Sequence, residues 1–168
     1  MMRRATKQDY GQVWRILREA ASWMMANGRD QWDDKYPTAE SLHSDIEHGD
    51  GWVIDDGGQV VAYCAISFGG EPSYDALEGE WLTAGPYAVV HRMAVALARR
   101  GQGMADRFFD HAEQMCRERH LASVRVDTNH DNREMLALIA RRGYQPTGRC
   151  YYYHGGRHVE RLAFELPL

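Results

Sequence analysis

The stretch from Tyr87 to Phe109 constrains the fold most, because a strand, a glycine turn and a helix follow one another there without a break. Tyr87–Ala98 is apolar and rich in Val and Ala, which predicts a short, buried central strand. Arg100–Ala105 reads RGQGMA and predicts a turn. From Met104 onward, apolar residues recur at helical spacing. Because such a turn presents backbone N–H groups at the positive end of a helix, we expect an anion site at Arg100–Ala105.

Two widespread phosphate-binding motifs do not match this turn. The chain contains no G-x-x-x-x-G-K-[ST] pattern, which excludes a P-loop. Asp106 stands where the dinucleotide-binding fingerprint requires a third small residue, which disfavours a dinucleotide enzyme. The pattern that fits is R-x-x-G-x-A, from Arg100 to Ala105, directly after a strand that ends in Met93-Ala94-Val95. It resembles the R/Q-x-x-G-x-G/A turn of the GNAT N-acetyltransferase superfamily, which holds the pyrophosphate of acetyl-CoA.

Length and composition restrict the class of protein. The 168 residues predict one domain, residues 1–168. A formal net charge of −4 indicates no nucleic-acid partner, and no apolar run is long enough to span a membrane. Two arginines near the N-terminus have no apolar stretch behind them, so no signal peptide is predicted. Cys64, Cys116 and Cys150 lack metal-ligand spacing, which predicts free thiols in a reducing cytoplasm and no metal site.

The remaining elements follow from periodicity and from turn residues. Thr6 with Asp9 predicts the start of a first helix, Thr38 the start of a second, and Asp131 the start of the last. The acidic segment 69–86 is expected to be a long loop. Further strands are expected at Met2–Ala5, Gly51–Asp55, Gln59–Phe68, Ser123–Thr128, Gln145–Tyr153 and Arg157–Leu166, the last two around a turn at His154-Gly155-Gly156.

This order of elements resembles the GNAT layout over essentially the whole chain. Asn132-x-x-Met135, followed by Arg141-Arg-Gly-Tyr144, is similar to a second motif of the superfamily. The resemblance implies an α/β (α+β) GNAT fold. Its central sheet is mixed and mostly antiparallel, has six to seven strands, is flanked by four helices, and is splayed between strands four and five.

The resemblance also implies which residues contact acetyl-CoA. In the superfamily, strand four offers its backbone to the pantetheine arm, the glycine turn holds the pyrophosphate, and the Asn of the second motif contacts the same arm. The residues implied here are Met93, Ala94, Val95, Arg100, Gly101, Gln102, Gly103, Met104, Ala105, Asn132 and Met135.

One position departs from the superfamily pattern. Many members carry a tyrosine on the last helix as the acid that protonates the departing sulfur, and Ile139 stands at that position here. An aliphatic side chain cannot donate a proton. Tyr144, Tyr151, Tyr152 or Tyr153 could take this role, or the thiolate leaves unassisted. We place Tyr151 among the candidate catalytic residues.

Direct attack of an amine on the thioester requires a base or a water path, and a donor to the oxyanion. We expect a backbone N–H near Met93 to be that donor. His91 is the best single candidate for the base, because with regular alternation it shares a strand face with Met93, and because an imidazole of pKa about 6.5 is mostly neutral at pH 7. The other reading is a histidine that satisfies hydrogen bonds in the core. Glu80 and Asp127 are the alternative bases.

The acceptor is expected beside two loops. In the superfamily the loop between the first two helices usually lines the acceptor pocket, and here it carries Trp32 and Tyr36. Trp32 is equally well explained as a residue packed into the core. The acidic loop adds Trp81 and Glu80, and aromatic faces together with carboxylates suit a cationic amine.

The resemblance therefore implies an enzyme that transfers an acetyl group from acetyl-CoA to a primary amine of a small molecule or a peptide, by direct attack in a ternary complex. The alternative is a non-catalytic acyl-CoA-binding or sensing module, which Ile139 keeps open. Neither reading involves a metal, a nucleic acid or a membrane. Whether the chain forms a homodimer is left open.

Overall fold

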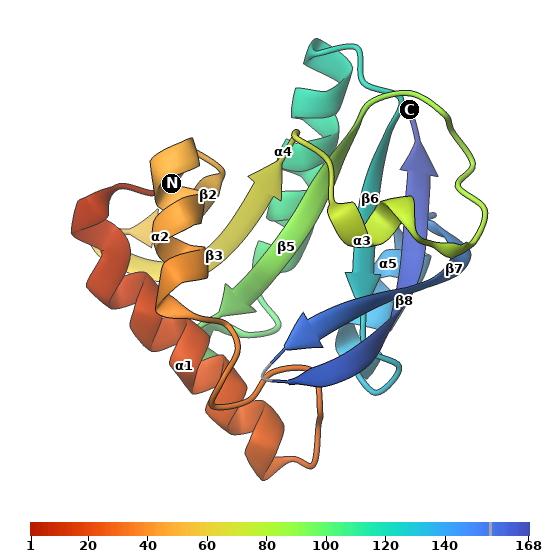
Figure 1. Ribbon diagram of the computed structural model, residues 1–168. Coiled ribbons are helices and arrows are strands. Elements are labelled where there is room, and N and C mark those ends of the chain that lie inside the picture. The colour runs from red at the N-terminus through yellow and green to blue at the C-terminus, as the bar shows by residue number, and fades with distance from the viewer. Residues whose placement is uncertain (155) are drawn as a thin grey trace. The chain divides into compact units, whose positions relative to one another are not determined.

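A computed structural model describes residues 1–154 and 156–168 (Figure 1). Gly155, in the turn predicted between the last two strands, lies outside the described residues. The chain packs as two compact units. The first unit comprises Met1–Ile66 and His91–Phe108, and the second unit comprises Ser67–Val90 and Phe109–Leu168.

Eight strands and five α-helices form among the described residues. In chain order they are β1 (Met2–Arg4), α1 (Tyr10–Ala26), α2 (Ala39–His48), β2 (Gly51–Asp56), β3 (Gln59–Ser67), α3 (Pro72–Asp75), β4 (Glu78–Gly79), β5 (Tyr87–Val95), α4 (Met104–Glu118), β6 (Ser123–Thr128), α5 (Arg133–Arg141), β7 (Gln145–His154) and β8 (Arg157–Pro167). The 3₁₀ turns Lys7–Asp9 and Leu97–Arg99 precede α1 and α4. No helix in the described part of the chain is long and apolar enough to cross a membrane.

The described strands are hydrogen-bonded in the order β1-β2-β3-β5-β6-β8-β7-β4. β5 and β6 run parallel, whereas β1–β2, β2–β3, β4–β7, β6–β8 and β7–β8 are antiparallel. The predicted mixed, mostly antiparallel sheet is therefore confirmed, with eight described strands in place of six to seven. The parallel register starts at Tyr87–Ser123 and ends at Val90–Val126, although β5 continues to Val95 and β6 to Thr128.

The segment 69–86 is not the irregular loop that its composition predicts, because it contains α3 and β4. Glu71 caps α3, since its Oε1 accepts the Ser73 N–H at 3.1 Å. β4 pairs with β7 at so close an approach that a Cβ on Gly79 would collide with the carbonyl of Thr147. These elements span 4 and 2 residues, which is too short for hydrophobic periodicity to reveal them.

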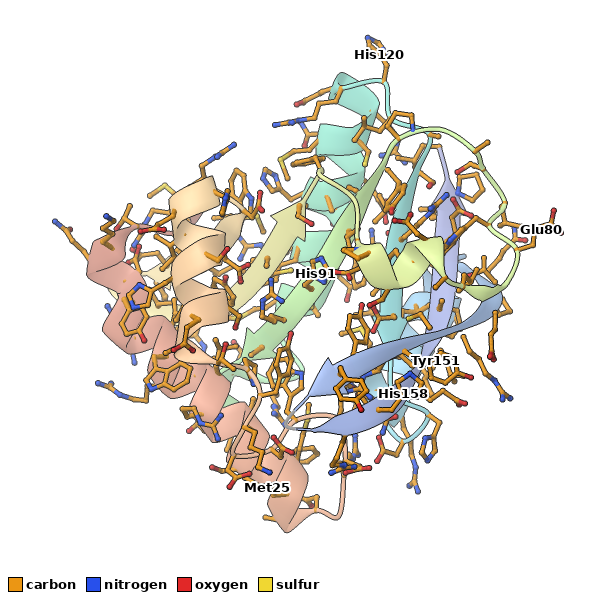
Figure 2. All side chains as sticks on the ribbon, viewed as in Figure 1. Met25, Glu80, His91, His120, Tyr151 and His158 are labelled. Carbon is orange, nitrogen blue, oxygen red and sulfur yellow. The ribbon has the colours of Figure 1, made fainter. Side chains whose placement is uncertain are left out.

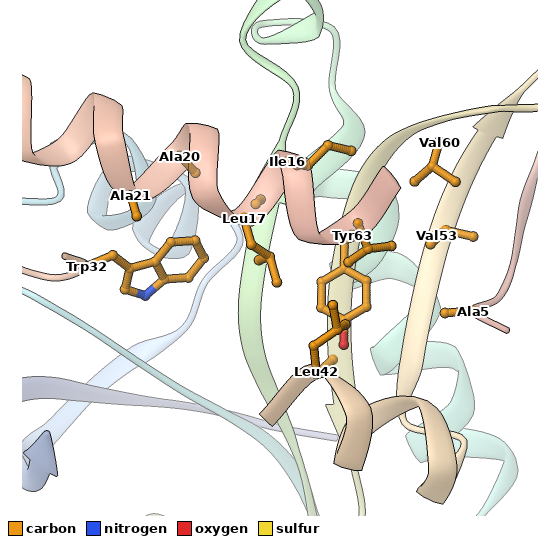
Figure 3. Close-up of a cluster of buried hydrophobic side chains, with 13 residues drawn as sticks. Ala5, Ile16, Leu17, Ala20, Ala21, Trp32, Leu42, Val53, Val60 and Tyr63 are labelled. Carbon is orange, nitrogen blue, oxygen red and sulfur yellow. The ribbon is translucent and has the colours of Figure 1, made fainter. Parts of the chain in front are cut away.

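In the first unit, α1 and α2 pack on one face of β2 and β3 (Figures 1 and 3). The buried face of α1 is the apolar stripe of Val13, Ile16, Leu17, Ala20 and Ala21.

The first helix begins one turn later than the sequence predicts. Thr6 and Asp9 close a 3₁₀ turn in which Asp9 Oδ2 accepts the Thr6 N–H at 2.8 Å. The same carboxylate binds Arg3 at 2.8 Å. The capping residues are therefore those predicted, and the regular helix starts after them, at Tyr10.

In the second unit, a buried network fixes the segment that leads into β5. Glu165 is fully buried and accepts hydrogen bonds from Ser123 Oγ at 2.6 Å and Arg125 Nε at 3.0 Å. Burial raises the pKa of Glu165, but hydrogen bonds led by that of Ser123 outweigh it and hold the pKa below its usual value. The Arg125 guanidinium stacks on Trp81 and Tyr87, with Cζ 4.1 and 3.8 Å from the ring centroids. Trp81 therefore packs against the Arg125 guanidinium, whose charge is paired with Glu165.

Candidate active site

The glycine turn between β5 and α4 lies wholly in the first unit. Gly101 and Gly103 both have a φ of 73°, in the left-handed region that favours glycine. The helical ladder of α4 opens with a bond from the Arg107 N–H to the Gly103 carbonyl at 3.2 Å. The N–H groups of residues 104–106 precede this bond and point out of the helix end, as in the anion sites that helix N-termini form.

The space beside this turn is open. No described heavy atom lies within 4 Å of a Cβ built on Gly101 or Gly103, apart from the chain neighbours. Two contacts of Arg99 stabilise the turn. Its Nη1 binds Asp56 Oδ2 at 2.7 Å, and its Nε donates to Gln102 Oε1 at 3.1 Å. The turn is therefore both ordered and open.

The second half of β5 leads into this turn. Ala94 is buried, whereas Met93 and Val95 are partly exposed. Ala96 follows the strand and donates its N–H to the Val61 carbonyl at 2.9 Å. The backbone to which the sequence assigns the pantetheine arm is thus tied to β3 at its end.

His91 is the first residue of β5 that belongs to the first unit, and its side chain is partly buried. Burial, together with the nearby Arg92 cation, lowers the pKa of His91 from 6.5 to about 3. The imidazole is therefore neutral at physiological pH, as the sequence predicts. It is also much less basic than the ordinary imidazole that the sequence suggests.

Regular alternation along β5 is broken at Arg92, whose φ is 45°. Its guanidinium binds the buried Asp45 of α2, with Nε–Oδ2 at 2.7 Å and Nη2–Oδ1 at 2.5 Å. Arg92 Nη1 also donates to the hydroxyl of Tyr36 at 3.1 Å. The prediction that His91 and Met93 share a face assumed regular alternation, and the strand does not keep it.

The two aromatic residues of the loop between α1 and α2 lie in different surroundings. Trp32 is 5% exposed and belongs to the core, where Figure 3 shows its indole beside Ala20 and Ala21. Tyr36 is partly buried and is held by Arg92. Burial supports the packing interpretation of Trp32 and leaves Tyr36 as the acceptor-loop residue.

The other candidate catalytic groups belong to the second unit. Glu80 is exposed, and Figure 2 shows it pointing away from the ribbon. Trp81 donates its indole N–H to the Tyr74 carbonyl at 3.0 Å. Tyr151 is partly exposed, and its hydroxyl donates to Glu78 Oε2 at 2.7 Å, which raises the pKa of Tyr151. The phenol proton of Tyr151 is therefore already engaged with a carboxylate.

Asp127 is held by two tyrosines. Its Oδ2 accepts the hydroxyls of Tyr74 at 2.6 Å and Tyr152 at 2.7 Å. Burial raises the pKa of Asp127, and the two hydrogen bonds oppose that shift. The effect of burial prevails, so the pKa of Asp127 stays above its usual value, and the network joins α3, β6 and β7.

The second predicted motif forms the start and the core face of α5. Asn132 caps the helix, since its Oδ1 accepts the Met135 N–H at 3.3 Å. Ile139 is fully buried, and Tyr144 is 4% exposed with its hydroxyl donating to Glu113 at 3.2 Å. Tyr144 is therefore withdrawn from solvent and bound to a carboxylate. Among the described residues, no group of three or more His, Cys, Asp or Glu side chains is arranged to hold a metal ion.

Two residues near the site escape the sequence reasoning. Arg92 is placed by a tertiary partner, Asp45, which no local pattern reveals. Trp23, near the end of α1, carries two guanidinium groups, with the Cζ of Arg100 at 4.4 Å and that of Arg29 at 4.9 Å from its ring centroid. The sequence feature that could have pointed to this stack is a tryptophan, Trp23, six positions before Arg29.

Comparisons with known sequences and structures also indicate an acetyltransferase. The sequence matches the acetyltransferase (GNAT) family over residues 14–144. A GNAT-family acetyltransferase structure from Streptococcus agalactiae is 30% identical, with a TM-score of 0.83 and coverage of 100% of this chain and 95% of that chain. A GNAT-family acetyltransferase from Listeria monocytogenes is 19% identical, with a TM-score of 0.78 and coverage of 100% and 94%.

A third structure was solved with a ligand. It is a putative acetyltransferase from Salmonella typhimurium with its cofactor acetyl-CoA, 15% identical, with a TM-score of 0.71 and coverage of 100% of this chain and 93% of that chain. This similarity and that to the Listeria protein show the fold. No curated protein matches the chain. The family match and the Streptococcus structure show that the chain belongs to the GNAT acetyltransferase family, which implies acetyl transfer from acetyl-CoA.

Proposed function

We propose that the chain, acting as one domain of residues 1–168, transfers the acetyl group of acetyl-CoA to a primary amine of a small molecule or a peptide. The observation that carries this proposal is the open glycine turn at the start of α4, which offers backbone N–H groups to a pyrophosphate. Residues 100–105 bind the phosphates, and Met93, Ala94 and Val95 offer their backbone to the pantetheine arm. Asn132 and Met135 complete the cofactor set.

The reaction is a direct attack in a ternary complex. The ammonium first loses a proton, and the neutral nitrogen forms a bond to the thioester carbonyl carbon. The carbon–sulfur bond then breaks, and a second proton leaves the nitrogen to give the amide. A backbone N–H near Met93 stabilises the oxyanion. Tyr151 is the candidate acid for the departing sulfur, because it is partly exposed, whereas Ile139 is buried and aliphatic and Tyr144 is enclosed. To act as the acid, Tyr151 must release its hydrogen bond to Glu78. Without such an acid CoA leaves as a thiolate.

His91 is the proposed acceptor of the amine proton, directly or through one water. Because its pKa is lowered to about 3, it is not expected to produce an acidic limb at pH 6–7. Deprotonation of the amine itself then governs the pH dependence, so the rate should rise towards the amine pKa. His91→Ala should lower kcat by about 10²-fold, within the range typical of general bases. A fall below about threefold would move the role to Glu80.

The acceptor is proposed to be a cation before it loses its proton. Tyr36, held by Arg92, lines its approach in the first unit. The acidic segment 69–86 favours a cation by long-range attraction. A peptide stays among the acceptors because one protein of this fold, the NatC complex, was solved bound to Gag peptide and CoA. Three buried free cysteines support a reducing, cytoplasmic location.

A panel of small and peptide amines tests the proposal. Each amine is mixed with acetyl-CoA and the protein, and free thiol is detected as it is released. Amine-dependent release, with initial-rate lines that intersect, is the expected result. Binding of CoA without release for any amine would favour the sensing module, which the buried Ile139 supports. Parallel lines would exclude the ternary complex.

A further inference from the structure

The end of α1 brings two cations to one aromatic ring. Gly28 has a φ of 67°, and the Arg29 N–H bonds back to the Met24 carbonyl at 2.8 Å. This reversal places the Arg29 guanidinium on Trp23, with Cζ 4.9 Å from the ring centroid. Arg100, the first residue of the glycine turn, reaches the same ring at 4.4 Å. The distance between the Cζ atoms of Arg29 and Arg100 therefore cannot exceed the sum of their two distances to the Trp23 ring centroid.

Two charged side chains close to this stack in the sequence, Arg99 and Glu19, interact with other groups. Arg99, next along the chain, is neutralised by Asp56 at 2.7 Å. Glu19 lies one helical turn before Trp23, and its carboxylate accepts the Leu97 N–H at 3.2 Å. Trp23 attracts each cation through its ring face, while the two cations repel each other. A polyanion beside Arg100 would interact favourably with both.

We propose that Trp23 positions Arg100 for phosphate binding and that Arg29, stacked on the same ring, is a second phosphate-binding cation. This inference rests on the proposed function, because the phosphates are those of CoA bound at the glycine turn. The competing interpretation is that Arg29 only stabilises the end of α1, as cations at a helix C-terminus do.

Binding of three ligands to the full chain separates these interpretations. CoA carries a pyrophosphate and a 3′-phosphate, dephospho-CoA lacks the 3′-phosphate, and acetyl-pantetheine lacks all three phosphates. Arg29→Gln should weaken CoA about fivefold, the upper range for an exposed charge pair, and leave acetyl-pantetheine unchanged. An equal loss for dephospho-CoA assigns Arg29 to the pyrophosphate, and a loss for CoA alone assigns it to the 3′-phosphate.

Arg4→Gln is the matched control. Arg4 stacks on Trp52 at 5.2 Å in the same unit, so this variant removes the same charge from a similar stack away from the turn. Arg29→Lys should restore part of the CoA affinity, and the Arg29→Gln defect should shrink in about 0.5 M salt, where surface charges are screened. If Arg29→Gln and Arg4→Gln bind CoA equally well, Arg29 is not a phosphate ligand.

CoA binding by variants of Trp23 tests its positioning role separately. Trp23→Leu should weaken CoA more than Arg29→Gln does, because both arginines lose their support, and Trp23→Phe should retain most of the affinity. If Trp23→Leu lowers the melting temperature and weakens CoA and acetyl-pantetheine by the same factor, the tryptophan is merely structural. If the wild-type chain binds no CoA, the proposed function fails, whereas wild-type binding with an unaffected Arg29→Gln variant overturns only this inference.

Discussion

Asp45→Asn tests the buried ion pair that Arg92 forms at the irregular position of β5. The Asp45 side chain is 7% exposed and that of Arg92 17% exposed, and the carboxylate accepts both Arg92 Nε at 2.7 Å and Arg92 Nη2 at 2.5 Å. It also accepts the hydroxyl of the fully buried Tyr63 at 2.8 Å. Asparagine keeps the shape but removes the charge and one acceptor oxygen. The substitution therefore leaves the Arg92 cation buried without a counter-ion.

The size of the effect follows from burial. Breaking a buried pair by removing one partner costs about 3–5 kcal/mol, a large part of the 5–15 kcal/mol that stabilises an ordinary domain. Asp110→Asn is the matched control, because Asp110 binds Arg142 at 2.6 Å but its side chain is 68% exposed. An exposed pair contributes at most about 1 kcal/mol. The two variants thus differ in the burial of the carboxylate, and Arg142 also keeps its ion pair with Glu113 at 2.9 Å when Asp110 is replaced.

Urea denaturation of the two variants measures the difference. Asp45→Asn should lose several times more unfolding free energy than Asp110→Asn. Adding Arg92→Met to Asp45→Asn should recover part of the loss, because it removes the unpaired cation. Equal losses for the two single variants, or a double variant no more stable than Asp45→Asn alone, would refute the argument from burial.

Three further predictions concern acid stability and packing. Asp9→Asn should lower stability at neutral pH and flatten the loss between pH 3.8 and about 2, because the Arg3 hydrogen bond lowers the pKa of Asp9 to about 2 and this contribution disappears as pH falls through that value; urea midpoints at stepped pH measure it. His91→Gln should reduce the loss of stability as pH falls from 6.5 towards 3, because in that pH range His91 binds a proton in the unfolded chain but stays neutral in the folded chain. An unchanged dependence of the unfolding free energy on pH would contradict the lowered pKa of His91. Trp32→Ala should cost about 3–5 kcal/mol of unfolding free energy, as expected for a buried indole, and a stable variant with only a raised acceptor KM would return Trp32 to the pocket.

Local patterns were sufficient for most of the fold. The stripe from Val13 to Ala21 has helical spacing, and its residues are the buried face of α1. Gly101 and Gly103 occupy left-handed positions that the glycine turn requires. In each case the physical cause is contained within a short segment, so the sequence shows it directly.

The remaining features depend on partners far along the chain. Arg92 departs from regular strand geometry and binds Asp45, which lies on α2, far away in the sequence. The pKa of His91 falls because of burial and of its neighbour Arg92, and Trp32 packs on residues of α1. No spacing rule encodes such contacts. The same limit explains why the catalytic and acceptor residues could not be placed from the sequence, whereas the backbone geometry of the glycine turn follows from six consecutive residues.

Calorimetric titration of acetyl-CoA into Gly103→Val and Gly143→Val tests the central claim most directly. Both glycines have positive φ, 73° and 82°, and neither has a neighbour within 4 Å of a built Cβ, so the two valines impose a similar backbone strain. Gly103→Val should lose at least tenfold in affinity, about 1.4 kcal/mol, because a branched side chain occupies the space that the pyrophosphate needs, and Gly143→Val should bind as the wild type does. A folded Gly103→Val protein with wild-type affinity would contradict the assignment of the turn to the phosphates of acetyl-CoA.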